Sequence, residues 1–89
     1  MSTVRKLNES ALRGIYDAYM HEAFPPAELK PLAVMLRLME RGRYLCYGYY
    51  RNGRLAAYAF FYRHDSRVLL LDYFAVTPEL RGRGVGSAF

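Results

Sequence analysis

Residues 68–86 read VLLLDYFAVTPELRGRGVG and carry the most specific pattern in the chain. The apolar run Val68–Val76 is typical of a strand, and Thr77–Leu80 forms a short connector. Glycines then recur at alternate positions, where the backbone can turn with its N–H groups pointing inward; they are Gly82, Gly84 and Gly86. A helix that starts there adds the positive end of its dipole. The pattern predicts an anion site suited to a diphosphate, with Arg81 and Arg83 at its rim.

A β-hairpin is predicted immediately upstream. Arg43–Arg51 and Arg54–Arg63 are rich in aromatic residues and are joined by Asn52-Gly53, a favoured two-residue turn. This turn predicts the pairs Tyr49–Ala56, Tyr47–Tyr58 and Leu45–Phe60 on one face, and Cys46–Ala59 and Gly48–Ala57 on the other. One face is then bulky and the other thin. On the thin face, Cys46 is interpreted as a small packing residue and not as a nucleophile.

The N-terminal half predicts a strand and two helices. Thr3–Leu7 alternates as a short strand does, and Asn8 can cap the helix that follows. That helix should end before Pro25, because the residue before a proline avoids the helical region. Its apolar face has spacings of three and four: Leu12, Ile15, Tyr16, Tyr19, Met20 and Ala23.

The second helix is predicted at Pro31–Glu40 and stops at Gly42. Its inner face is formed by Leu32, Leu36 and Met39. Further apolar residues widen this surface, which is either buried or part of an acceptor pocket. Val68–Val76 is apolar almost throughout and should be central or covered on both faces. The predicted fold is α+β with a mainly antiparallel sheet: strand, two helices, three strands and the start of a third helix.

Composition narrows the class of protein. The 89 residues form a single domain, residues 1–89, and 53% of them are hydrophobic, which excludes a disordered chain. The net charge of +5 favours anionic partners in general. A single cysteine provides no disulfide framework, and neither a signal peptide nor a membrane span is evident. We therefore expect a cytoplasmic protein with no membrane partner and no metal.

Three kinds of glycine loop have related spacings. A Walker-type loop requires a lysine after the last glycine, and none follows here. A dinucleotide fingerprint requires a third glycine where Ser87 stands, directly after a strand of a strand–helix–strand unit. The remaining pattern, Arg/Gln-x-x-Gly-x-Gly/Ala, is matched by Arg81, Gly84 and Gly86.

With its preceding strand and connector, this loop resembles the acetyl-CoA-binding segment of the GCN5-related N-acetyltransferases, the GNAT family. The resemblance implies an acyl-CoA-dependent N-acetyltransferase that passes acetyl from acetyl-CoA directly to an amine acceptor. It also implies the cofactor-binding residues Phe74, Ala75, Val76, Arg81, Gly82, Arg83, Gly84, Val85, Gly86 and Ser87. Main-chain groups of Phe74 and Val76 would bond the pantetheine arm, and the N–H near Val76 would polarise the thioester carbonyl.

The same resemblance suggests where the acceptor reacts. Asp72 is the only carboxylate on the third strand of the predicted meander, and we expect it to share a face with Phe74 and Val76 as the general base. Tyr73 is expected on the opposite face, in the core. Core packing is the alternative for the candidate acceptor-site residues Tyr16, Tyr19 and Phe24.

The family fold continues past this loop, so we expect a C-terminally incomplete N-acetyltransferase domain that is weakly active or inactive alone. An exposed edge of the last strand would then favour self-association. Two alternatives remain: a truncated, non-catalytic fragment that acts in assembly, and a basic RG-loop module that binds nucleic acid. A single RG unit next to core-like aromatics argues against the second, so no nucleic-acid partner is expected. The acceptor amine is not specified by these residues.

Overall fold

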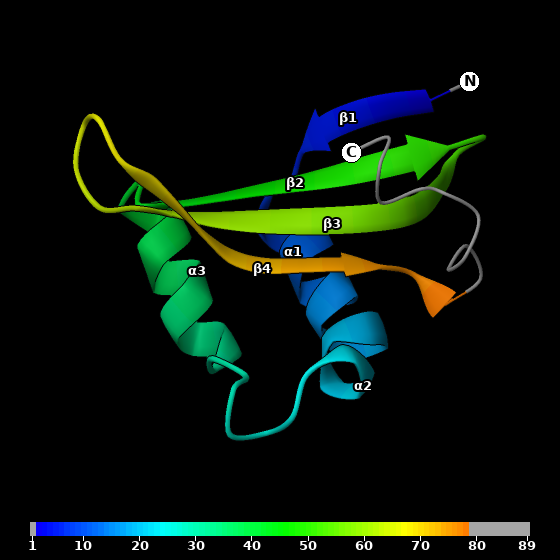
Figure 1. Ribbon diagram of the computed structural model, residues 1–89, viewed down its shortest axis with the longest axis horizontal. Helices are drawn as coiled ribbons and strands as arrows, with labels where there is room; N and C mark the ends of the chain where they lie inside the picture. Colours follow the sequence, from blue (N-terminus) through cyan, green and yellow to red (C-terminus); the bar gives the residue numbers. More distant parts are fainter. Residues whose placement is uncertain (1, 79–89) are drawn as a thin grey trace.

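The computed structural model describes residues 2–78, in which two helical segments cover one face of a four-stranded antiparallel sheet (Figure 1). The strand order is β1-β2-β3-β4. The elements in chain order are β1 (Ser2–Lys6), α1 (Glu9–Ile15), the π-helical turn η1 (Tyr16–Met20), α2 (His21–Ala23), α3 (Leu32–Glu40), β2 (Tyr44–Arg51), β3 (Arg54–Arg63) and β4 (Leu69–Val76). The predicted α+β class and element order are confirmed for these residues, whereas the predicted third helix lies outside them.

Local signals place the first helical segment correctly. The Asn8 side chain accepts a hydrogen bond from the Ala11 amide at 2.9 Å, as the cap prediction requires. Helical structure ends at Ala23, and Phe24 is extended with φ −132° and ψ 140° immediately before Pro25. The π-helical turn in the middle of this segment was not predicted.

The core lies between the helices and one face of the sheet. On the first helical segment Leu12, Ile15, Tyr16 and Met20 are buried, which confirms most of the predicted apolar face. On α3 the fully buried residue is Met35 and not one of the three predicted residues. Leu32, Leu36 and Met39 are partly buried. Leu32 and Met39 lie three and four residues from Met35 and share its helical face, and Leu36 lies at the side of that face.

The hairpin turn is confirmed, but the predicted pairs are wrong. Asn52 and Gly53 both have positive φ, 51° and 80°, as the turn requires. A β-bulge between Tyr49 and Tyr50 inserts one extra residue on β3 and shifts the pairing by one beyond it. The observed partners are Tyr49–Ala57, Gly48–Tyr58, Tyr47–Ala59, Cys46–Phe60 and Leu45–Phe61.

The predicted thin face is therefore wrong as well. The shift sets Cys46 and Gly48 opposite Phe60 and Tyr58, so small residues on β2 meet large ones on β3. Cys46 is buried in the core, consistent with its interpretation as a packing residue. Gly48 has little room: a Cβ there would lie 2.9 Å from Cε1 of Tyr50 and 3.1 Å from methyl carbons of Leu7 and Leu55.

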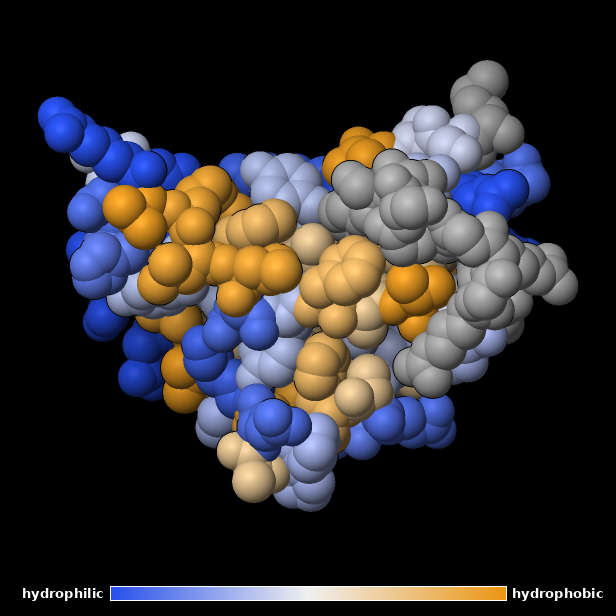
Figure 2. Space-filling model, in the orientation of Figure 1, coloured by the Kyte–Doolittle hydropathy of each residue, from blue (hydrophilic) through white to orange (hydrophobic). Residues whose placement is uncertain are grey.

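Within residues 2–78, β4 is an edge strand. The prediction that this strand is central or covered on both faces is wrong for its first half. Leu69, Leu70 and Leu71 are 50%, 50% and 61% exposed. In the view of Figure 2, apolar side chains gather over the first half of β4. None of the helices in the described part of the chain is long and apolar enough to cross a membrane.

Candidate active site on strand β4

A second β-bulge, in the middle of β4, orients the candidate base. Tyr73 pairs with Phe60 and Leu71 with Phe61, so Asp72 is the extra residue. Its Oδ2 accepts a hydrogen bond from the Tyr44 hydroxyl at 2.5 Å and lies 2.8 Å from the Lys30 ammonium. The bulge turns Asp72 toward the helix-covered face, which also holds Tyr44 and Tyr73. The expectation that Asp72 shares a face with Phe74 and Val76 is wrong.

The loop between α2 and α3 is held against this part of β4. The Tyr73 hydroxyl donates to the Glu28 carbonyl at 2.7 Å and accepts from the Lys30 amide at 2.7 Å. The Tyr16 hydroxyl donates to the Lys30 carbonyl at 3.0 Å. The Phe24 ring meets the Tyr73 ring edge to face at 4.8 Å between centroids. Two predicted acceptor-site residues, Tyr16 and Phe24, thus lie at this loop.

Tyr19, the third predicted acceptor-site residue, is partly buried against the core. Its placement matches the core-packing alternative. The structure brings Tyr16, Phe24 and Asp72 to one loop, and Tyr19 packs against the core.

Burial fixes the protonation of two groups near Asp72. It raises the pKa of Tyr44 far above the ordinary range, and the hydrogen bond to Asp72 raises it further. Tyr44 therefore remains a hydrogen-bond donor to the carboxylate. Burial, with a smaller contribution from the Asp72 charge, also raises the pKa of Cys46 to about 12. The thiol is protonated at neutral pH, which does not suit a nucleophile.

The carboxyl end of β4 is anchored by a residue that the sequence analysis missed. Thr77 is 2% exposed; its amide donates to the Ala56 carbonyl at 2.8 Å and its hydroxyl to the Leu55 carbonyl at 3.1 Å. The cofactor-binding residues predicted on the strand precede it directly. Phe74 is 39% exposed, Ala75 packs toward the helices, and Val76 packs on a small cluster with Tyr49, Ala56 and Ala57.

The remaining predicted cofactor-binding residues lie outside the described residues. They are Arg81, Gly82, Arg83, Gly84, Val85, Gly86 and Ser87. Lys30 and Tyr44, which contact Asp72, were not predicted as site residues. No local signal could have identified them, because they lie 42 and 28 residues from Asp72 in the sequence.

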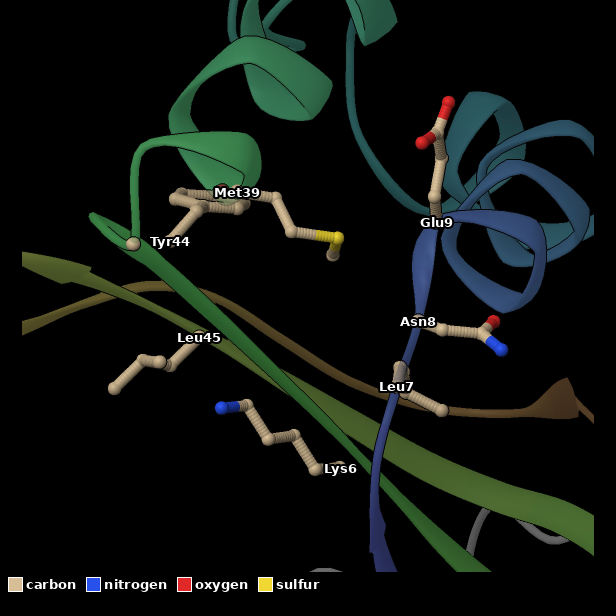
Figure 3. Close-up of a pocket in the computed structure, with 8 residues that line it drawn as sticks. Lys6, Leu7, Asn8, Glu9, Met39, Tyr44 and Leu45 are labelled. Carbon is tan, nitrogen blue, oxygen red and sulfur yellow. The ribbon is translucent and has the colours of Figure 1, made fainter.

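A pocket of about 410 Å³ lies between the connection from β1 to α1 and the end of α3 (Figure 3). It adjoins the cluster formed by Asp72, Lys30 and Tyr44, because Tyr44 belongs to both. Lys6, Leu7, Met39 and Leu45 line it together with Tyr44. None of the predicted site residues lines this pocket. Residues 2–78 contain no group of three or more His, Cys, Asp or Glu side chains arranged to hold a metal.

Comparison with known protein families decides the family of the chain. The profile of the Acetyltransferase (GNAT) family matches residues 10–89, which include both the Asp72 region and the glycine loop. The chain belongs to the GNAT acetyltransferases. The family resemblance drawn from the glycine loop and its preceding strand is thus confirmed. No curated protein sequence matches the chain.

Solved structures support the same fold. The ribosomal-protein-S18-alanine N-acetyltransferase of Escherichia coli is 25% identical, with a TM-score of 0.71 over 99% of this chain and 54% of that chain. An acetyltransferase from the GNAT family of Bacteroides thetaiotaomicron is 18% identical, with a TM-score of 0.79 over 97% of this chain and 50% of that chain.

AAC(6')-Iy, in complex with the bisubstrate analog CoA-S-monomethyl-acetylneamine, is 22% identical, with a TM-score of 0.62 over 99% of this chain and 65% of that chain. The chain spans about half the length of the first two structures. The two that are less than 25% identical show a common fold alone.

Proposed function

We propose that this GNAT chain takes part in the direct transfer of an acetyl group from acetyl-CoA to an amine. The family match over residues 10–89 is the observation that carries the proposal. The similar fold of AAC(6')-Iy, bound to an analog that joins CoA to acetylneamine, supports acetyl-CoA as the co-substrate. When bound, acetyl-CoA supplies the activated acetyl thioester.

We assign acetyl-CoA binding to two segments of the chain. Backbone amides of Gly82–Gly86, with Arg81, Arg83 and Ser87, hold the diphosphate. Phe74 and Val76 are two residues apart, so their main-chain groups point to the same edge of β4 and bond the pantetheine arm. The Thr77 anchor supports this assignment, because it fixes the end of β4 against β3 directly before the connector to the glycine loop.

Asp72 is the proposed general base. An amine must lose its proton before or during attack on the thioester, and a carboxylate on the adjoining strand can accept that proton. Asp72 and Val76 are four residues apart, or roughly 13 Å along an extended strand, so the proton reaches the carboxylate through water. The two described hydrogen bonds to Asp72 both end on Oδ2 and hold the side chain in one orientation.

The base assignment is tested with Asp72→Asn, which keeps the shape but removes the charge. Release of coenzyme A thiol is measured with acetyl-CoA and a panel of primary amines, and kcat/KM should fall about 100-fold. Asp17→Asn, at an exposed carboxylate in η1, is the matched control and should retain full activity. A wild-type rate above the uncatalysed rate, together with equal rates for both variants, would contradict the role of Asp72.

Binding of nucleic acid is the alternative outcome for the glycine loop. If bound coenzyme A protects Arg81 and Arg83 from an arginine-modifying reagent, that result would support the proposal. Protection by RNA that disappears at high salt, without protection by coenzyme A, would instead indicate a nucleic-acid-binding module.

A further inference from the structure

The two groups next to the Lys30 ammonium, a carboxylate and an aromatic ring, are of the kinds that bind ammonium ions. Nζ of Lys30 lies 2.8 Å from Oδ2 of Asp72 and 5.4 Å from the centroid of the Tyr44 ring. A carboxylate accepts N–H bonds from an ammonium, and the face of an aromatic ring attracts a cation. The Lys30 and Asp72 side chains are 28% and 27% exposed, so solvent reaches the pair.

The loop does not depend on this ammonium for its position. The Lys30 amide is bonded to the Tyr73 hydroxyl and the Lys30 carbonyl to the Tyr16 hydroxyl. The Glu28 carbonyl adds a second bond to Tyr73, and Phe24 packs on the ring of Tyr73. The Lys30 side chain can therefore rotate into solvent while its backbone stays in place.

We propose that Asp72 and Tyr44 form an alkylammonium-binding site, which Lys30 fills from within the chain and which a cationic acceptor fills by displacing Lys30. This inference rests on the proposed acetyl transfer and names a class of acceptor for it, the aliphatic diamines. An ammonium held at Asp72 lies roughly 13 Å along the strand from the thioester at Val76, so the second amine of the same molecule is the one that reacts. Exchange of one ammonium for another preserves the charge beside Asp72. A neutral or anionic acceptor would leave the partly buried carboxylate without a counter-charge. A quaternary ammonium offers no N–H group for Oδ2.

The test uses the full chain with Lys30→Ala, which removes the atoms from Cγ to Nζ and leaves space for n-propylammonium. Loss of the ion pair should lower Tm by about 4 °C. At roughly 100 mM, n-propylammonium chloride should recover at least half of that loss relative to sodium chloride, because a ligand that binds the folded state stabilises it by mass action. n-Propanol and tetramethylammonium chloride should not.

Two matched variants separate site binding from a general solvent effect. Lys30→Met fills the same space without a charge and should show no specific response to n-propylammonium. Lys30→Ala combined with Asp72→Asn should also show none, because the carboxylate is lost. Recovery in either variant equal to that in Lys30→Ala, or no recovery in Lys30→Ala itself, overturns the inference.

The outcome is independent of the proposed function. Acetyl-CoA binding is measured by calorimetry on wild type and on Lys30→Ala. Binding of acetyl-CoA without recovery by n-propylammonium removes the ammonium site and leaves acetyl transfer intact. Recovery without acetyl-CoA binding supports the ammonium site and contradicts acetyl transfer.

Discussion

Gly48 lies within β2, where it pairs with Arg5 of β1 and Tyr58 of β3. A Cβ at this position would come within 3.1 Å of side-chain atoms of Leu7, Tyr50 and Leu55. We expect Gly48→Ala to lower the free energy of unfolding by about 1–3 kcal/mol, since these side chains must shift. Gly14→Ala, in the interior of α1 with nothing within 4 Å of the added Cβ, should raise it by about 0.5–1 kcal/mol. Urea denaturation measures both, and a neutral Gly48→Ala would contradict the close approach.

Cys46 predicts a loss of stability at high pH. Its folded-state pKa is about 12, against an ordinary value of 9.0, so the folded chain retains a proton that the unfolded chain loses. This stabilisation is fully present below pH 9 and is lost as the pH rises from about 9 toward 12. The raised pKa of Tyr44 adds to the same trend. Urea midpoints between pH 8 and 10.5 should fall less steeply in Cys46→Ala than in wild type; parallel curves would contradict the burial of the thiol.

At the scale of elements, the predictions that the structure confirms rest on local signals. Asn8, Pro25 and Asn52-Gly53 act on their own neighbours, so a cap, a helix end and a turn followed directly from the sequence. The two bulges depend instead on how β3 packs against both neighbouring strands. The Tyr49/Tyr50 bulge displaced the predicted pairs, and the bulge at Asp72 reversed the predicted face of the candidate base. The ion pair of Asp72 with Lys30 joins distant segments and had no local signature.

The loop between α2 and α3 should depend strongly on one hydroxyl of β4. Tyr73→Phe removes the bonds to the Glu28 carbonyl and the Lys30 amide, and it should lower the free energy of unfolding by about 1–3 kcal/mol. Hydrogen exchange at Lys30 should accelerate more than exchange within α3. Tyr16→Phe removes a single bond to the same loop and should have the smaller effect. Equal exchange in Tyr73→Phe and wild type would contradict the anchoring.

At the scale of the molecule, the helix-covered face is packed while β4 exposes apolar side chains. Leu69, Leu70 and Leu71 are each at least half exposed on the last strand of the described sheet. The chain also spans about half of the first two similar structures. We therefore keep the prediction that the chain associates through this strand. Analytical ultracentrifugation should show concentration-dependent association that Leu71→Lys weakens; a monomer at all concentrations would contradict it.

Acetyl-CoA binding is the central requirement for the whole molecule. Isothermal titration calorimetry on the full chain should give saturable binding, and Gly84→Val should weaken it by about tenfold or more, since a Cβ obstructs the approach of the diphosphate to the backbone amides. Gly14→Ala should bind as the wild type does. Absence of binding by a folded wild-type chain, or equal binding by Gly84→Val, would contradict the assignment of the glycine loop.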